Sequence, residues 1–365
     1  MKILCDREKL QEGLAIANNV IPSKSTKPIL SNVSLVATEN GLELVGTDLE
    51  VAVRYAIEDV KVEEPGTAVL PAKVALDFVR DLTSETVSLE VKGNNCVLTG
   101  GTDSCELVTS DPDEFPVVAR FDEQDALSLQ AGTFTSLVKR TAFAAAREQG
   151  RYAMHGVLTS LENDRLQMVA TDGRRLAVAS HPVDKNGDDQ SVIVPTKGLQ
   201  LFGRVIGDPL NQVKLSFGEN QIGLKTPSAE VFARLLDGEF PRYKAVVPDS
   251  TENAMEADAE LLGRKLRLVA NVTGDETRAV RLSLKKGELH LFGQSAGYGE
   301  ANAVMEVDFK GEPVEIAFNP DYVIEGLKSC ETPHVRLEFN DKSSPGKFTL
   351  GESYVYVVMP ITIDT

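Results

Sequence analysis

Tryptophan is absent from this chain of 365 residues, and the aromatic residues together make up only 6% of it. Single-stranded nucleic acid is usually bound by exposed aromatic side chains set among basic ones, and the sequence contains no such cluster. Basic residues are also in the minority, because 38 lysines and arginines stand against 55 aspartates and glutamates, for a net charge of −17. Phosphate backbones attract lysine and arginine, so the overall charge argues against tight direct binding of nucleic acid.

Cysteine, histidine and long apolar runs are scarce as well. The four cysteines show no Cys-x-x-Cys spacing, which predicts reduced, mostly buried thiols in a cytoplasmic protein. The four histidines never pair at the spacing of metal ligands, so we expect neither a metal site nor a cofactor. No apolar run approaches the roughly 20 residues of a membrane span, and the segment MKILCDREKLQ lacks the apolar stretch of a secretory signal. We therefore expect no contact with a membrane.

The sequence does contain a long internal repeat. The segment GTDLEVAVR (46–54) matches ATDGRRLAVAS (170–180), with Thr47 and Thr171 standing 124 residues apart, and a polar turn in FGQSAGYGEANAV (292–304) occupies the third position. Two further phrases recur three times in the same order, namely AVLPAKVALDFVRDL (68–82) with VIVPTKGLQLFGRVI (192–206) and EIAFNPDYVIEGLKS (315–329), and DREKLQEGLAIANNVI (6–21) with AGTFTSLVKRTAFAAA (131–146) and DAELLGRKLRLVANVT (258–273). Copies of about 120 residues have the size of ordinary domains. We predict three domains, at 1–120, 126–247 and 249–365.

The middle copy predicts the order of elements in one unit. ALSLQA (126–131) alternates like a strand, and GTFTSLVKRTAFAAA (132–146) carries apolar residues on one helical face. Strand-like runs joined by tight turns follow, then a short helix after Pro195, then three more strands. Such hairpins build antiparallel sheets. We predict an α+β fold repeated three times, in which each unit reads βαβββαβββ.

Charge is unevenly distributed between the predicted helices and the rest of the chain. The helical segments 6–21, 71–82, 131–146, 195–206, 258–273 and 319–330 carry a net charge of +3, so the remaining residues carry −20. This division predicts a mildly basic helical face on an acidic body. Such a face binds DNA weakly and without reading its sequence. Retention of DNA would then require something other than contact energy.

Seven segments together resemble a known family: PILSNVSL (28–35), GTDLEVAV (46–53), VATDGRRLAVAS (169–180), VIVPTKG (192–198), LLDGEFPRYKAVVP (235–248), AFNPDYVIEGL (317–327) and YVVMP (356–360). In combination they resemble the bacterial sliding clamps, the β subunits of DNA polymerase III, over the whole chain. The resemblance implies three DNA-clamp domains per chain and a head-to-tail dimeric ring, with helices lining the hole and antiparallel sheets outside. It implies a processivity subunit without catalytic residues, within a holoenzyme that is a DNA-directed DNA polymerase and so a nucleotidyltransferase.

The resemblance also implies partners and sites. The clamp would encircle double-stranded DNA without sequence preference, form a homodimer, and bind the DNA polymerase III alpha subunit, the clamp loader, other DNA polymerases and repair proteins through short Gln/Leu/Phe peptides. The pocket for these peptides falls on Met154, Thr171, Gly173, Arg174, Arg175, Leu176, Pro241, Val246, Asn319, Tyr322, Val357, Met359 and Pro360. DNA contacts fall on Lys24, Lys73, Arg80, Arg151, Tyr152, Lys197 and Arg204. The dimer interface falls on Cys105, Asn271 and Val272.

Two other functions deserve comparison with this one. The segment GQSAG (293–297) satisfies the Gly-x-Ser-x-Gly pattern of hydrolases, in which a strand precedes the serine and a helix follows it. The residues after it, YGEANAVMEVDF, alternate like a strand, and the repeat assigns Ser295 to a hairpin turn equivalent to Thr171. A scaffold of several domains that never closes around DNA is the other alternative.

Overall fold

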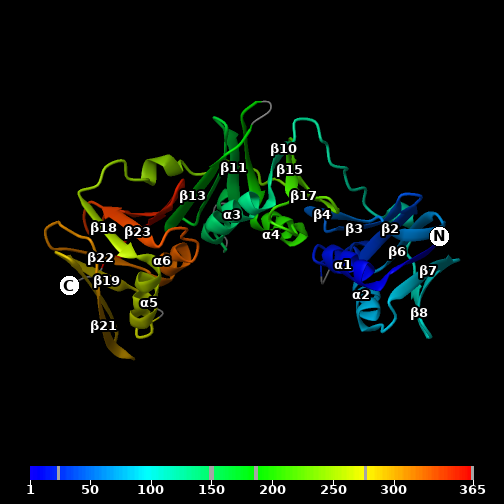
Figure 1. Cartoon of the computed structure of the whole chain (residues 1–365), viewed down its shortest axis with the longest axis horizontal. Coiled ribbons are helices and arrows are strands. Elements are labelled where there is room, and N and C mark those ends of the chain that lie inside the picture. Colours follow the sequence, from blue (N-terminus) through cyan, green and yellow to red (C-terminus); the bar gives the residue numbers. More distant parts are fainter. Residues whose placement is uncertain (23–24, 148–151, 185–187, 275–277, 363–365) are drawn as a thin grey trace. The chain divides into compact units, whose positions relative to one another are not determined.

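The computed structural model describes residues 1–22, 25–147, 152–184, 188–274 and 278–362 (Figure 1). It consists of two compact units, the first made mainly of Met1–Phe134 and Lys197–Leu235 and the second mainly of Thr135–Lys185 and Leu236–Thr365. No helix within these described residues is long and apolar enough to span a membrane.

Unit 1 contains a five-stranded and an eight-stranded sheet. The first has the order β5-β1-β7-β8-β9, with β1 (Lys2–Asp6), β5 (Val60–Glu64), β7 (Thr86–Lys92), β8 (Asn95–Gly100) and β9 (Asp103–Val108). The second has the order β10-β15-β16-β17-β4-β3-β2-β6, with β2 (Asn32–Thr38), β3 (Gly41–Thr47), β4 (Val51–Ile57), β6 (Gly66–Pro71), β10 (Leu127–Gln130), β15 (Gln212–Phe217), β16 (Gln221–Lys225) and β17 (Ala229–Arg234).

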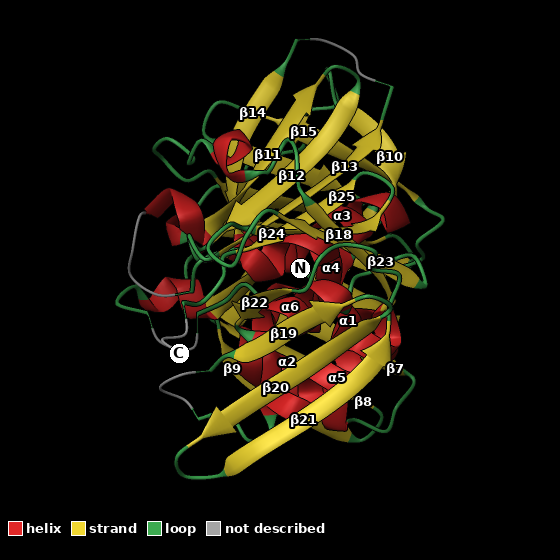
Figure 2. Cartoon of the chain, turned by 90° about the vertical axis from the view of Figure 1, so that its left-hand side faces the viewer, coloured by secondary structure: helices red, strands yellow, loops and turns green. Residues whose placement is uncertain are grey.

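Unit 2 contains an eight-stranded and a four-stranded sheet. The larger has the order β14-β11-β12-β13-β25-β24-β23-β18, with β11 (Gly156–Glu162), β12 (Arg165–Thr171), β13 (Arg175–Pro182), β14 (Gln190–Pro195), β18 (Asn253–Asp258), β23 (His334–Phe339), β24 (Gly346–Gly351) and β25 (Tyr354–Val358). The smaller has the order β21-β20-β19-β22, with β19 (Val280–Lys285), β20 (Glu288–Ser295), β21 (Gly299–Glu306) and β22 (Val314–Phe318). Figure 2 shows β19, β20 and β21 side by side, with β21 at the edge.

The helices pack their apolar faces on these sheets. Unit 1 holds α1 (Arg7–Asn18), α2 (Ala72–Asp81) and most of α4 (Thr196–Val205); unit 2 holds α5 (Ala259–Ala270) and α6 (Pro320–Leu327); α3 (Ala131–Thr141) begins in unit 1 and ends in unit 2. Helix α1 begins where the Asp6 carboxylate accepts a hydrogen bond from the Lys9 amide at 3.0 Å. Short 3-10 helices are η1 (Pro28–Ser31), η2 (Pro112–Glu114), η3 (Ala142–Ala144), η4 (Tyr152–His155) and η5 (Tyr243–Val246).

The predicted α+β class and the antiparallel sheets are confirmed. The series of elements within one copy of the repeat is longer than predicted. Four strands, β11 to β14, lie between the two helices of the middle copy, and β19 to β22 lie between those of the third. The predicted order leaves out the strand that leads into the second helix. The first copy has five strands there, because β5 adds to β1 along the edge of its sheet.

The packing division does not coincide with the sequence repeat. The middle copy contributes β10 and β15 to β17 to unit 1, and β11 to β14 to unit 2. Strand β4 of the first copy pairs with β17 of the second, and β13 of the second pairs with β25 of the third. Each large sheet therefore joins halves of two neighbouring copies.

Candidate functional site

The repeated phrase at 170–176 forms a tight hairpin turn held by its own side chains. The Thr171 hydroxyl donates to the Arg175 carbonyl at 2.6 Å and accepts from the Gly173 amide at 3.1 Å. The Asp172 carboxylate accepts from the amides of Arg174 and Arg175 at 2.9 and 3.0 Å. Gly173 has φ of 86°, in the left-handed region that favours glycine. The side chains of Thr171 and Asp172 therefore hold this turn.

The first copy builds the same turn with one difference. The Thr47 hydroxyl accepts from the Leu49 amide at 3.0 Å, and the Asp48 carboxylate accepts from the Val51 amide at 2.8 Å. Leu49 occupies the position of Gly173, with φ of 78°, and its side chain is 48% exposed. The turn thus depends on the Thr and Asp side chains more than on glycine, although a leucine in this conformation is strained.

Arg175 occupies the centre of a buried polar network behind the turn. Its guanidinium is 5% exposed, binds Asp172 at 3.1 Å and pairs with Glu325, and donates to the Phe143 carbonyl at 2.8 Å. It also lies over the rings of Phe143 and Tyr322, at 5.4 and 4.6 Å from their centroids. Burial lowers the pKa of Arg175, but the bond to Glu325 and the neighbouring groups outweigh burial and raise it overall. The Arg175 cation therefore links the turn to Glu325 and to the two aromatic rings.

We expect Arg175→Ala to lower the free energy of unfolding by about 3 kcal/mol, because it removes a buried cation and leaves the half-buried carboxylates of Asp172 and Glu325 without their counter-charge. Arg174→Ala is the matched control, since Arg174 is exposed in the same turn, and it should change stability by less than about 0.5 kcal/mol. Urea unfolding of both variants tests this expectation. Equal losses for the two variants would contradict a structural role for Arg175.

An apolar layer lies beside this network on β12, β13 and β25. Val169, Leu176 and Val357 form its buried centre, and Leu176 is directly opposite Val357 in the β13–β25 ladder. The Tyr243 hydroxyl closes one side by donating to the Gln167 side chain at 2.6 Å. Partly buried apolar side chains pack against this layer: Leu158, Val178, Phe240, Val247 and Val355.

All residues predicted for the peptide pocket belong to unit 2. Thr171, Arg175, Leu176 and Val357 are buried, Met154, Pro241, Asn319, Tyr322 and Pro360 are half-buried, and Gly173, Arg174, Val246 and Met359 are exposed. The structure brings several into direct contact, because the Met359 amide donates to the Arg174 carbonyl at 2.8 Å and Arg175 stacks on Tyr322. Leu176 is only 2% exposed, whereas Met359 and Val246 are 40% and 46% exposed. The accessible apolar anchors are therefore Met359 and Val246 rather than Leu176.

The residues predicted to contact DNA lie on helices where they are described. Lys73 and Arg80 are exposed on α2, and Lys197 and Arg204 are exposed on α4. Three of these cations already have partners within unit 1: Arg80 binds Asp77 at 2.8 Å, Lys197 pairs with Asp48, and Arg204 donates to the Asn19 side chain. Lys24 and Arg151 lie outside the described residues, as does the side chain of Tyr152.

The residues predicted for the dimer interface lie at two separate places. Cys105 is half-buried in β9, the last strand of its sheet. Asn271 ends α5, and Val272 follows it.

The GQSAG segment takes the hairpin conformation that the sequence predicts. Ser295 ends β20 and the chain enters β21 at Gly299, so a strand follows the serine where a hydrolase has a helix. The Ser295 hydroxyl accepts from the Tyr298 amide at 3.3 Å. The register differs from the prediction by one residue, because Gln294 and not Ser295 occupies the position of Thr47. Gln294 is opposite Glu300, as Thr47 is opposite Ala52. This turn is one residue longer than its counterparts.

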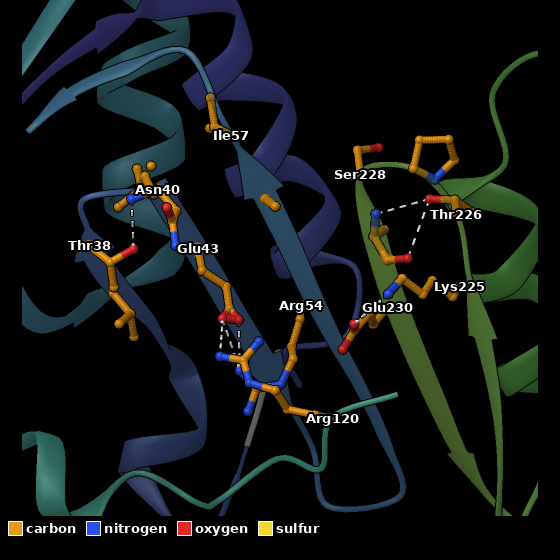
Figure 3. Close-up of a pocket in the computed structure, with 16 residues that line it drawn as sticks. Thr38, Asn40, Glu43, Arg54, Ile57, Arg120, Lys225, Thr226, Ser228 and Glu230 are labelled. Carbon is orange, nitrogen blue, oxygen red and sulfur yellow. Dashed lines mark hydrogen bonds and ion pairs between the residues drawn. The ribbon is translucent and has the colours of Figure 1, made fainter. Parts of the chain in front are cut away.

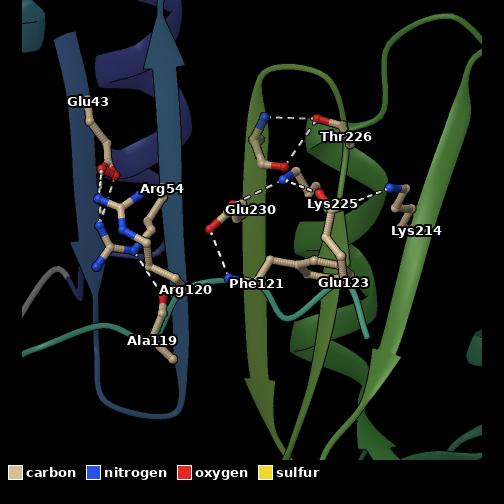
Figure 4. A network of polar contacts seen from close by, with 11 residues as sticks. Glu43, Arg54, Ala119, Arg120, Phe121, Glu123, Lys214, Lys225, Thr226 and Glu230 are labelled. Atoms are coloured by element: carbon tan, nitrogen blue, oxygen red, sulfur yellow. Dashed lines mark hydrogen bonds and ion pairs between the residues drawn. The ribbon is translucent and has the colours of Figure 1, made fainter. Parts of the chain in front are cut away.

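Sequence reasoning missed a polar cavity of about 490 Å³ in unit 1 (Figure 3). Arg54 and Arg120 both bind Glu43 there, at 2.8 and 2.9 Å. Lys225 on the other side binds Glu123 at 2.7 Å, and Figure 4 shows this second group of contacts. These residues come from four separate segments, namely β3, β4, residues 120–123 and β16, so no local motif predicts the cavity.

The carboxylate of Glu123 also binds Lys214, at 2.6 Å. Hydrogen bonds from Lys214 and Lys225 lower the pKa of Glu123 to about 2. Glu123 lies in the segment that connects the first copy to the second, and both lysines belong to the second copy. These exposed ion pairs therefore attach the connecting segment to the second copy.

Three models of protein families match almost the whole chain. Residues 1–119 match the N-terminal domain of the DNA polymerase III beta subunit, residues 128–242 its central domain, and residues 244–362 its C-terminal domain.

Individual relatives agree with these matches. The chain is 30% identical to the beta sliding clamp of Escherichia coli strain K12 over 366 residues, covering all of both chains, and 30% identical to that of Pseudomonas putida over 368 residues. Its structure resembles that of the DNA polymerase III subunit beta from Pseudomonas aeruginosa, with a TM-score of 0.93 and 29% identity over 99% of this chain and 100% of that one. The fold also matches a DNA polymerase sliding clamp from Bacillus subtilis, with a TM-score of 0.96 and 24% identity over the whole of both chains.

Proposed function

The chain belongs to the family of DNA polymerase III beta subunits, the bacterial sliding clamps, and from this premise we propose that two copies join head to tail around duplex DNA. Its family is one of processivity factors, so the chain is a clamp and not a catalytic subunit. Its three copies, 1–120, 126–247 and 249–365, would be the clamp domains. Two chains then contribute six such domains to the ring.

The pairing of strands across repeats is the observation that carries the ring. At both junctions inside the chain, the strand after the repeated turn pairs with the last strand of the following copy, β4 with β17 and β13 with β25. The strand after the turn in the third copy is β21, and the last strand of the first copy is β9. Each of these strands lies at the edge of its sheet. A second copy can satisfy both edges by the same pairing, which gives a head-to-tail contact.

Helix contacts support the same junction. The Arg204 guanidinium on α4 donates to the side chain of Asn19, which ends α1. The corresponding residues of the other copies are Arg80 on α2 and Asn271, which ends α5. A pairing of Arg80 with the partner's Asn271 would repeat this contact between subunits. Cys105 and Val272 would lie at the same interface.

The site in unit 2 is proposed to receive short peptides of the DNA polymerase III alpha subunit, the clamp loader, other polymerases and repair proteins. Exposed Met359 and Val246 would supply apolar anchors, and a flexible methionine adapts to different peptides. The exposed cations of α2 and α4 would contact the DNA backbone weakly, as sliding requires. We place this activity in the cytoplasm.

We expect light scattering at micromolar concentration to give twice the chain mass of 39.5 kDa. Cys105→Arg combined with Val272→Arg should shift the protein to the monomer mass, because the added bulk and charge meet at the proposed interface. Leu210→Arg is the control, since Leu210 is 76% exposed and lies on neither edge strand. A wild-type protein that stays monomeric at tens of micromolar would exclude the ring.

A further inference from the structure

The register of pairing at the subunit junction can be worked out from the two junctions inside the chain. The Arg234 amide donates to the Glu50 carbonyl at 2.8 Å, and the Met359 amide donates to the Arg174 carbonyl at 2.8 Å. Glu50 and Arg174 are equivalent residues of two copies, 124 positions apart. The residue 124 positions further along is Tyr298, directly before β21.

Glycine contacts with the helices give an independent alignment, in which β20 is shifted by one residue from the sequence period and β21 keeps that period. A side chain at Gly46 would meet the Ala17 carbonyl at 2.9 Å, and one at Gly293 would meet the Val269 carbonyl at 3.0 Å. Gly46 is opposite Val53 in its hairpin and Gly293 is opposite Ala301. Ala301 therefore corresponds to Val53, which keeps Tyr298 equivalent to Glu50.

The other strand is aligned by its hairpin. Arg234 is opposite Gln221 between β16 and β17, and Val108 is opposite Asn95 between β8 and β9. Both members of the two pairs differ by 126 positions, so Val108 corresponds to Arg234. The subunit junction then aligns Val108 with the partner's Tyr298, and Glu106 with the partner's Glu300.

The exposures of these residues agree with this register. Val108 is 72% exposed and Tyr298 is 76% exposed, so both side chains are accessible to a second copy. On the helix-facing side the same register aligns half-buried Cys105 with the partner's half-buried Ala301. A shift by one residue would turn these buried and exposed faces against each other.

The pair Glu106 and Glu300 shows how the subunit junction differs from the two junctions inside the chain. The position of Glu106 and Glu300 is filled by Phe232 opposite Ala52 at one internal junction, and by Val357 opposite Leu176 at the other. All four of those apolar residues are buried in packed clusters. Glu106 and Glu300 are exposed, and neither forms an ion pair within the described parts of the chain. Glu106 accepts a hydrogen bond from the Asn95 side chain, at 2.5 Å.

Building on the proposed ring, we infer that Glu106 faces the partner's Glu300 across the subunit junction and weakens that junction by charge repulsion. Like charges directly opposite in a sheet are destabilising. Arg281 lines the same cavity as Glu300, but its guanidinium lies over the Phe292 ring and within 3.9 Å of Glu315. The two junctions inside the chain hold apolar pairs, whereas the proposed subunit junction holds opposed carboxylates.

Charge reversal tests this pairing. Glu106→Lys and Glu300→Lys should each tighten the dimer about tenfold relative to Glu64→Lys, because two junctions per ring gain an attractive pair. Glu64→Lys is the matched control, with the same change of charge on β5, the opposite edge of the sheet that contains Glu106. The double variant Glu106→Lys with Glu300→Lys restores like charges, and its dissociation constant should return to within about threefold of the control.

The dissociation constants are measured by sedimentation equilibrium at low and high salt. Tightening in both single variants and its loss in the double variant supports the inference. A double variant that dimerises as tightly as the singles would overturn the inference and leave the ring intact. Monomers for every protein, wild type included, would overturn the ring and the inference together.

Discussion

Once loaded by a matching clamp loader with ATP, the protein is expected to remain on nicked circular DNA through a high-salt wash and to leave when the circle is cut. A closed ring is linked to a circle whatever its contact energy, whereas the free end of a linear molecule lets it slide off. The exposed cations on α2 and α4 are few and mostly paired with acidic or amide groups, so contact energy alone cannot resist the wash. We expect most of the bound protein to be lost after linearisation.

The measurement is the amount of labelled protein that co-elutes with DNA before and after restriction cleavage. Blocking both ends of the linear DNA with a bulky protein should restore retention, which separates escape over an end from damage by cleavage. Without the loader, binding should be weak and should fall steeply as salt is raised. Equal retention on circles and on open fragments would contradict topological linkage and leave the non-encircling scaffold as the better description.

Peptide binding is expected to fall by thirtyfold or more when Leu176→Ala is combined with Met359→Ala. A short peptide loses much conformational freedom on binding, so a few anchors must supply most of its affinity, and truncating such an anchor typically costs about 2 kcal/mol. Met359→Ala alone should produce most of this loss, because Met359 is 40% exposed while Leu176 is 2% exposed. Fluorescence polarisation of a labelled Gln-Leu-x-Leu-Phe peptide measures the effect.

Stability must be followed in the same experiment. Leu176 belongs to the buried layer with Val169 and Val357, so its truncation should also lower the free energy of unfolding by about 2 kcal/mol or more. Val51→Ala in unit 1 is the control for this loss, since Val51 is 2% exposed and belongs to the first copy of the turn. It should lower stability without changing peptide affinity. A double variant that binds as tightly as the wild type would remove the pocket from this site.

The sequence predicts the repeat and the turn, because both are local patterns. Thr47 and Thr171 make the same hydrogen bonds within four residues of themselves, so an identical phrase implies an identical turn. The α+β class follows in the same way from alternating strands joined by short hairpins. These features need no knowledge of distant parts of the chain.

The sequence does not predict what long-range pairing decides. Arg175 is predicted as a pocket residue, but its pairing with Glu325, 150 positions away, in a buried network cannot be read from the sequence. Leu176 is predicted as a member of the pocket, but its pairing with Val357 of β25 cannot be read from the sequence. The crossing of the sheets from one copy to the next is equally invisible, because periodicity shows that copies are alike and not how they pair.

The sharing of sheets between copies limits how the chain can be divided. Excision of the middle copy as a separate protein would strip β17 of β4 and β13 of β25, and so bare two strand edges whose side chains are buried in the intact chain. Bare edges of this kind template association with other chains. The copies are therefore repeated in sequence, but a single copy is not an independent folding unit. A fragment with intact sheets must keep β4 with β17 or β13 with β25.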